Sequence, residues 1–179
     1  MNKDKKFVVV LKPNGRETFI SLEEVGKTFE IDEMYKFCEC RCIGIGHFGK
    51  DAVEALDRSL PLDLIDMFGY KTLKPCFIYD DEGLLVDNPQ INYVGSMLYG
   101  GTICGNIVVA CERIDDEGEL NTFGFSYGEA KFMEWFCKML NGMVIESGFE
   151  LETPEPSMEF RSFDNLDEMI NFVKEKENS

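Results

Sequence analysis

Three cysteines in the run CECRC, Cys38, Cys40 and Cys42, have a spacing that could support metal chemistry. On a strand, alternate residues share a face, so the three thiols would point the same way and two of them could bind a soft metal. A closed tetrahedral zinc site needs four ligands, which usually come from paired C-x-x-C motifs. We therefore predict no metal site here, and interpret the three cysteines as small core residues of a strand.

The next stretch, GIGHFG at 44–49, has the G-x-G-x-x-G spacing of dinucleotide-binding loops. A genuine site of that kind needs a buried parallel strand before the loop, a helix that opens within it, and an acidic residue about 20 positions later. Here the preceding segment is half charged and the helical pattern begins only at Asp51. The sequence favours a glycine-rich loop, and we predict no cofactor. The chain's only histidine, His47, lies in this loop without an evident partner.

The third stretch, NYVGSMLYGG at 92–101, combines an asparagine with small residues and paired glycines. The side chain of Asn92 can donate and accept hydrogen bonds, so it could cap the turn that follows or face a ligand. The small residues also indicate a close backbone approach, either by another strand or by a ligand. The candidate residues for binding a ligand or partner are Asn92, Tyr93, Tyr99, Gly100 and Gly101.

No pair of titratable groups stands out as an acid and a base. The pattern Asp-Asp-Glu-Gly occurs twice, at 80–83 and 115–118, but neither copy has the spaced oxygen ligands of a calcium-binding loop. Both are interpreted as hairpin turns. General acid–base chemistry needs titratable groups that converge, so we predict no catalytic residues.

Apolar periodicity predicts one α+β domain over residues 1–150. Strands are expected at 7–11, 17–20, 27–31, 38–42, 76–79, 84–86 and 107–112. Helices are expected after Ser21, over 52–60 and 61–69, and over 127–140 with Asn141-Gly142 as the stop. We expect a mainly antiparallel sheet of hairpin-linked strands, packed on one side by the helices after Asp51 and Ser126. Residues 151–179 are predicted to form an acidic connector and an amphipathic helix capped by Asp164, packed on the domain or partly mobile.

The composition of the chain bears on nucleic-acid binding, membrane insertion and cellular location. The chain has 179 residues and a formal net charge of −16, with its acidic residues dispersed and no basic cluster, so we expect no direct nucleic-acid binding. No apolar run approaches the roughly 20 residues of a membrane span. Seven cysteines without a recognisable signal peptide favour reduced thiols and a cytoplasmic location.

Part of the chain carries a series of motifs. An acidic turn ending in glycine is followed by an asparagine with small residues and Leu-Tyr-Gly, and then by an apolar strand. The matching residues are Asp81-Glu82-Gly83, then Asn92, Gly95, Ser96, Leu98, Tyr99 and Gly100, and then Ile103-Cys104-Gly105 with Ile107-Val108-Val109. Together they resemble the family catalogued as domain of unknown function 3846, found mainly in proteins of bacterial mobile elements and phages.

The resemblance covers about residues 7–112, with an insertion over about 34–73. Upstream, Val25-Gly26 with Phe29-Glu30 is similar to the family's Val-Gly-Gly-x-Ile-Glu element. Tyr93 stands where the family commonly has arginine, so no anion-binding role is transferred to it. The resemblance implies a mobile-element origin and a cytoplasmic protein, but no reaction, because the family has no established one.

Three functions are compatible with these observations. The preferred one is a non-enzymatic binding or modulator protein of a mobile element that acts through an unknown protein partner. One alternative is an acidic mimic of DNA that occupies the cleft of a host DNA-binding enzyme, since ordered carboxylates can compete with phosphates for basic side chains. The other is a small-ligand binder that uses the turn at 92–101.

Overall fold

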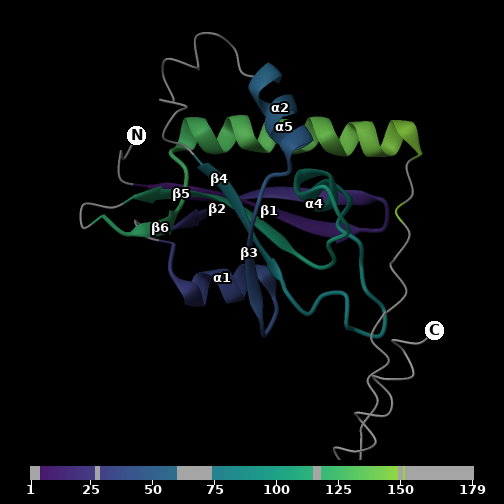
Figure 1. The fold of residues 1–179 in the computed structure, drawn as a ribbon, viewed down its shortest axis with the longest axis horizontal. Coiled ribbons are helices and arrows are strands. Elements are labelled where there is room, and N and C mark those ends of the chain that lie inside the picture. The colour runs from purple at the N-terminus through teal and green to yellow at the C-terminus, as the bar shows by residue number, and fades with distance from the viewer. Residues whose placement is uncertain (1–4, 27–28, 60–73, 115–117, 149–150, 152–179) are drawn as a thin grey trace, which may run out of the picture.

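The computed structural model of the chain describes residues 5–26, 29–59, 74–114, 118–148 and 151. These residues form six strands and four helices, which confirms the predicted α+β class (Figure 1). The elements are β1 (Lys6–Asn14), β2 (Glu17–Val25), α1 (Ile31–Cys38), β3 (Ile43–His47), α2 (Lys50–Ser59), β4 (Lys74–Asp80), α4 (Tyr93–Tyr99), β5 (Ile107–Ile114), β6 (Leu120–Phe123) and α5 (Tyr127–Ser147).

The sheet has the order β2-β1-β5-β4-β3, and every pair in it is antiparallel. β5 is central: its first half pairs with β1, while its second half pairs with β6 on the same side. Six consecutive residues of β5 are buried, because helices cover both faces of the sheet at this strand. That double burial explains the unbroken apolar run from which the strand was predicted.

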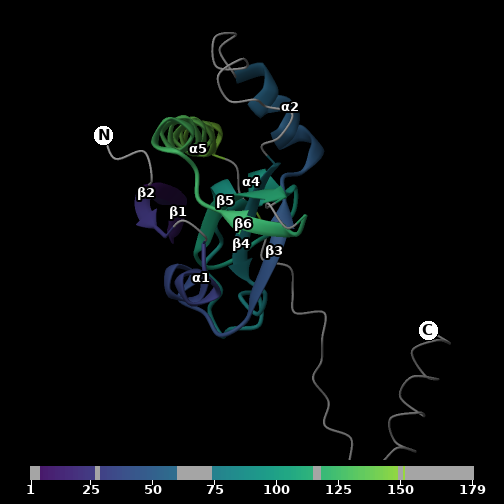
Figure 2. The ribbon, with the colours of Figure 1, turned by 90° about the vertical axis from the view of Figure 1, so that its left-hand side faces the viewer.

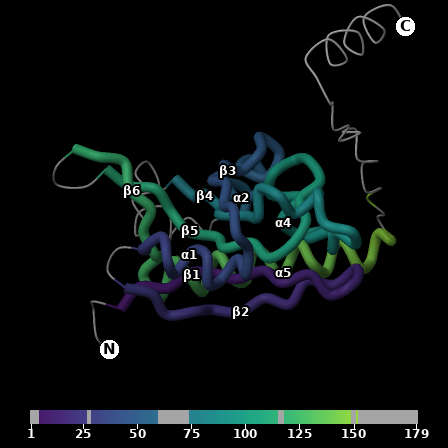
Figure 3. Tube along the Cα trace, turned by 90° about the horizontal axis from the view of Figure 1, so that it is seen from below, coloured from purple at the N-terminus to yellow at the C-terminus, as the bar shows by residue number. Residues whose placement is uncertain are grey.

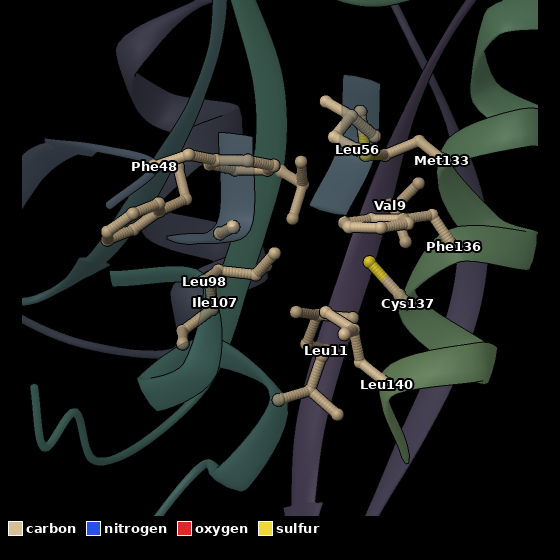
Figure 4. Close-up of a cluster of buried hydrophobic side chains, with 14 of the residues drawn as sticks. Val9, Leu11, Phe48, Leu56, Leu98, Ile107, Met133, Phe136, Cys137 and Leu140 are labelled. Atoms are coloured by element: carbon tan, nitrogen blue, oxygen red, sulfur yellow. The ribbon is translucent and has the colours of Figure 1, made fainter. Parts of the chain in front are cut away.

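Helices α2, α4 and α5 cover one face of the sheet, and α1 covers the other (Figure 2). A hydrophobic core lies on each face of the sheet, and alternate residues of β1 point into one or the other. Val9 and Leu11 pack toward α5, and Val8 and Val10 pack toward α1. In the larger core, side chains from β1 and β5 meet those of α2, α4 and α5 (Figure 4). The edge strands β2 and β3 lie at opposite borders of the sheet (Figure 3).

The helix predicted after Ser21 is wrong, because β2 continues through it to Val25. β2 pairs with β1 along its whole length, from Asn14↔Glu17 to Lys6↔Val25, and this ladder satisfies more backbone groups than a single capping box can. The hydroxyl of Ser21 instead donates to Glu23 Oε1 at 3.0 Å. The turn at Gly15, with φ +62°, is the predicted hairpin.

The strands predicted at 27–31 and at CECRC are also wrong. Residues 27 and 28 lie outside the described ranges, and Ile31 opens helix α1, capped by Glu30 with Glu33 in a capping box. Cys38 ends this helix, and Glu39 follows in the left-handed conformation at φ +55°. The segment predicted as a glycine-rich loop is in part a strand, β3, which includes Gly44, Gly46 and His47.

Two further boundaries differ from the predictions. Residues 84–86 form no strand; their side chains are exposed, and β4 pairs instead with β3 and β5. Helix α5 runs through Asn141-Gly142 to a cap at Gly148 (φ +62°), because Val144 is still buried beneath it. The predicted helices at 61–69 and after Asp164, and most of the turn at 115–118, lie outside the described residues. No helix in the described ranges is long and apolar enough to cross a membrane.

Candidate functional site

β3 forms one border of the sheet and pairs with a single described strand, β4. The hydrogen bond from Asp81 N to Cys42 O, 3.1 Å, fixes which of its backbone groups face β4. In an antiparallel ladder, bonded pairs alternate, so Gly44 and Gly46 bond to β4 while the N–H and C=O groups of Ile43, Ile45 and His47 face outward. No described residue is hydrogen-bonded to these outward groups. Within the described residues, they form an open backbone edge.

The glycines of β3 make room for aromatic rings that cross over the strand. A Cβ on Gly44 would lie 2.6 Å from Tyr79 Cζ, and one on Gly46 would lie 2.5 Å from Phe77 Cζ. The rings therefore reach from β4 over β3, on the face covered by α2 and α4. Such cross-strand coverage of glycine by aromatic rings stabilises a strand that has no side chains of its own on that face. Side chains of β3 project only on the other face, where Ile45 is 48% exposed.

Asn92, a predicted site residue, is fully buried and caps helix α4. Its Oδ1 accepts from Gly95 N at 3.0 Å, and its Nδ2 donates to Leu11 O at 2.9 Å and to Gly105 O at 3.1 Å. The amide thus joins the start of α4 to β1 and to the turn before β5. The structure uses Asn92 as a cap, the first of the two roles foreseen for it.

The close backbone approach foreseen at 92–105 is made by the sheet. A Cβ on Gly95 would overlap Ile107 Cδ1, so α4 lies directly on β5. The N–H of Gly49 donates to Leu98 O at 2.7 Å, which joins the end of α4 to the segment after β3. The exposed ring of Tyr99 packs edge-on against Phe77, with centroids 5.8 Å apart.

The predicted site residues are therefore divided between the two ends of α4. Tyr99 and the cap Gly100, with φ +84°, lie at the end near β3, followed by Gly101. Tyr93 lies at the opposite end, in the first turn of the helix. Burial, together with the nearby Asp81 carboxylate and Tyr99 phenol, raises the pKa of Tyr79. The Tyr79 phenol, whose ring crosses over Gly44 of β3, thus stays neutral.

His47, at the end of β3, has a partner that sequence reasoning missed. Its Nε2 lies 2.8 Å from Glu112 Oε2 of β5, across the intervening strand β4. The Glu112 side chain is 10% exposed and the imidazole of His47 is 63% exposed, so the carboxylate is buried in the sheet and the imidazole contacts solvent. The pair ties the edge strand to the centre of the sheet. No local spacing signals a contact between residues 65 positions apart.

Cysteines lie close to this pair without forming a reactive centre. Cys76, the pairing partner of His47 in β4, is fully buried, and burial followed by the charge of Glu112 raises its thiol pKa. Burial also raises the pKa of the Cys38 thiol, which donates to Ile78 O. Within the described ranges, no three His, Cys, Asp or Glu side chains are grouped as metal ligands.

The opposite edge strand, β2, has two protecting features that β3 lacks. It carries three glutamates, and the outward-facing N–H of Thr18 donates to Asn141 Oδ1 of α5 at 2.9 Å. β3 carries no Lys, Arg, Asp, Glu or Pro. Charged residues and covering groups are the usual means by which proteins prevent an edge strand from pairing with another chain. Their absence makes β3 the candidate site.

Compared with known proteins, the chain matches no family model, no curated protein and no solved structure. The resemblance described under Sequence analysis therefore stays a prediction.

Proposed function

We propose that this protein is a non-catalytic binding or modulator protein that acts by protein interaction, and that an extended segment of its partner pairs with the open edge of β3. The observation that carries the proposal is the contrast between the two edges of one sheet. β2 carries three glutamates and its outward Thr18 N–H is bonded to α5, whereas β3 carries no Lys, Arg, Asp or Glu, and its outward backbone groups at Ile43, Ile45 and His47 have no hydrogen bond from any described residue.

This edge offers both kinds of contact that strand addition uses, which are backbone hydrogen bonds and side-chain contacts. Backbone hydrogen bonds to an edge strand supply affinity, and the side chains beside it supply specificity. On one face an added strand would meet Ile43 and Ile45, and on the other the rings of Tyr79 and Tyr99. Tyr99 is one of the predicted binding residues, and its contact with Phe77 beside β3 supports the proposal.

The charge distribution supports this proposal more than imitation of DNA. Described carboxylates on several elements are paired with cations of the chain, including Glu24 with Lys5, Glu54 with Arg58, and Glu129 with Arg113. A cytoplasmic location and a mobile-element origin belong to the proposal, and their support is the resemblance to the family of unknown function.

The test selects short random peptides displayed on phage against the wild-type protein. Selected peptides are then titrated by fluorescence anisotropy against Ile45→Lys and against the matched control Phe19→Lys. Phe19 is an exposed apolar residue of the other edge strand, on the same face of the sheet as Ile45. A lysine at position 45 removes apolar contact from the binding edge, so we expect an affinity loss of at least about tenfold, or about 1.4 kcal/mol, with no loss in the control.

Equal affinities in the two variants would place binding away from β3 and contradict the proposal. Failure to enrich any peptide on the folded protein would contradict it as well. Circular dichroism of both variants confirms that neither substitution unfolds the sheet.

A further inference from the structure

We propose that the strand added to β3 is supplied by β3 of a second copy of this chain, in an antiparallel pair about a two-fold axis at Ile45. This inference rests on the proposed function, because both use the outward backbone groups of the same edge. It names the partner as the protein itself, and the six-stranded sheet becomes continuous across two molecules. Closed two-fold dimers are the commonest form of homo-oligomer, and they need a surface that complements itself.

The backbone of β3 meets that requirement. The outward-facing residues 43, 45 and 47 are placed symmetrically about Ile45. In the two-fold arrangement, Ile45 lies opposite its own copy, and Ile43 lies opposite His47 of the other molecule. Each of these opposed residues presents both an N–H and a C=O group, so every pair can exchange the two hydrogen bonds of an antiparallel ladder.

The side chains of β3 are also compatible with self-pairing. Glycine lies opposite glycine in this register, because Gly44 faces Gly46 of the other copy. That face therefore contains no β3 side chain that could clash, and the rings of Tyr79 and Phe77 approach it from above. On the other face, the two half-exposed Ile45 side chains meet at the axis and shield each other from water.

Charge sets the expected strength of the dimer. Each copy carries a net charge of −16, which opposes association, while the strand itself carries no carboxylate or lysine. Salt screens charges over about 10 Å at 0.1 M. The five-residue strand contributes a short interface, so we expect a reversible dimer that becomes tighter as sodium chloride is added.

Sedimentation velocity of the full chain over a wide concentration series tests the inference. We expect a reversible shift from monomer to dimer. Ile45→Lys places two like charges opposite each other at the axis and should raise the dimer dissociation constant at least about tenfold. Phe19→Lys, the same change in charge on β2, should leave it unchanged. A second variant, Ile45→Pro, removes an outward N–H without removing a hydrogen bond to β4, and should also weaken the dimer.

A protein that is monomeric at every concentration would overturn the inference, as would a dimer that Ile45→Lys and Ile45→Pro leave intact. These results are separable from the test of the proposed function. A monomer that still binds selected peptides through β3 removes the second copy as partner and leaves strand addition in place. A dimer weakened by Ile45→Lys, in a protein that selects no peptides, contradicts strand addition by other proteins and leaves the β3 edge to self-association alone.

Discussion

Replacing Asn92 with alanine should lower the free energy of unfolding by about 3 kcal/mol, because one side chain satisfies three backbone groups. Gly95 N, Leu11 O and Gly105 O would each lose the hydrogen bond that this side chain makes, and the side chain is fully buried. An unsatisfied buried polar group costs roughly 1 to 3 kcal/mol, reduced where water enters the space left by the amide. Loss of the helix cap adds to the same total.

Urea unfolding followed by circular dichroism measures this loss. Asn88→Ala, a change at an exposed asparagine, is the matched control and should alter stability by less than about 0.5 kcal/mol. Asn92→Asp keeps an oxygen for Gly95 N but presents no NH₂ group to the two carbonyl groups, so it should not restore stability. An Asn92→Ala variant as stable as the wild type would contradict the role of this residue as a junction of the fold.

Replacing Gly95 with alanine should destabilise the protein by about 2 kcal/mol. Its new methyl group would occupy the position of Ile107 Cδ1, in the contact between α4 and β5. Overpacking of a closed core typically costs about 1 to 3 kcal/mol. In a helix with free space around this position, Gly→Ala would stabilise the protein by about 1 kcal/mol. A loss of stability would therefore indicate that α4 packs against the sheet at Gly95.

Ile107→Val removes the clashing Cδ1 and supplies a double-mutant test. Alone it should cost about 1 kcal/mol, and combined with Gly95→Ala it should cost clearly less than the two single changes together. Additive losses, measured by the same urea titration, would show that the two side chains do not meet. The helical position Gly142, where an added Cβ would meet no other atom within 4 Å, serves as the control for the gain in helix propensity.

Elements with strong local signals could be predicted from the sequence. The run at 107–112 became the central strand, and Ser126 with Glu129 starts α5 through a capping box. The errors arose where long-range pairing outweighed a local signal. Ser21 and Glu24 have capping-box spacing but lie in β2, paired with β1. Asn141 was interpreted as a stop, yet its side chain bonds the edge of β2 and the helix continues.

The candidate site was harder to predict than the fold. The alternation Ile-Gly-Ile-Gly at 43–46 is a strand pattern, but the glycine spacing and the low strand propensity of glycine favoured a loop. The pairing of β3 with β4 explains why positions 44 and 46 are glycines, because the rings of Tyr79 and Phe77 occupy the space that a side chain would need. The contact of His47 with Glu112 depends on three strands lying side by side.

The most direct test of the open edge is residue-resolved amide hydrogen exchange of the Ile45→Lys variant, measured by NMR. In this variant self-pairing is disfavoured and β3 remains paired with β4. We predict slow exchange at Gly44 and Gly46, whose amides bond to β4, and fast exchange at positions 43, 45 and 47, whose amides face outward. Equal protection at all five positions would mean that another part of the chain already occupies this edge, and would contradict its role as a binding site.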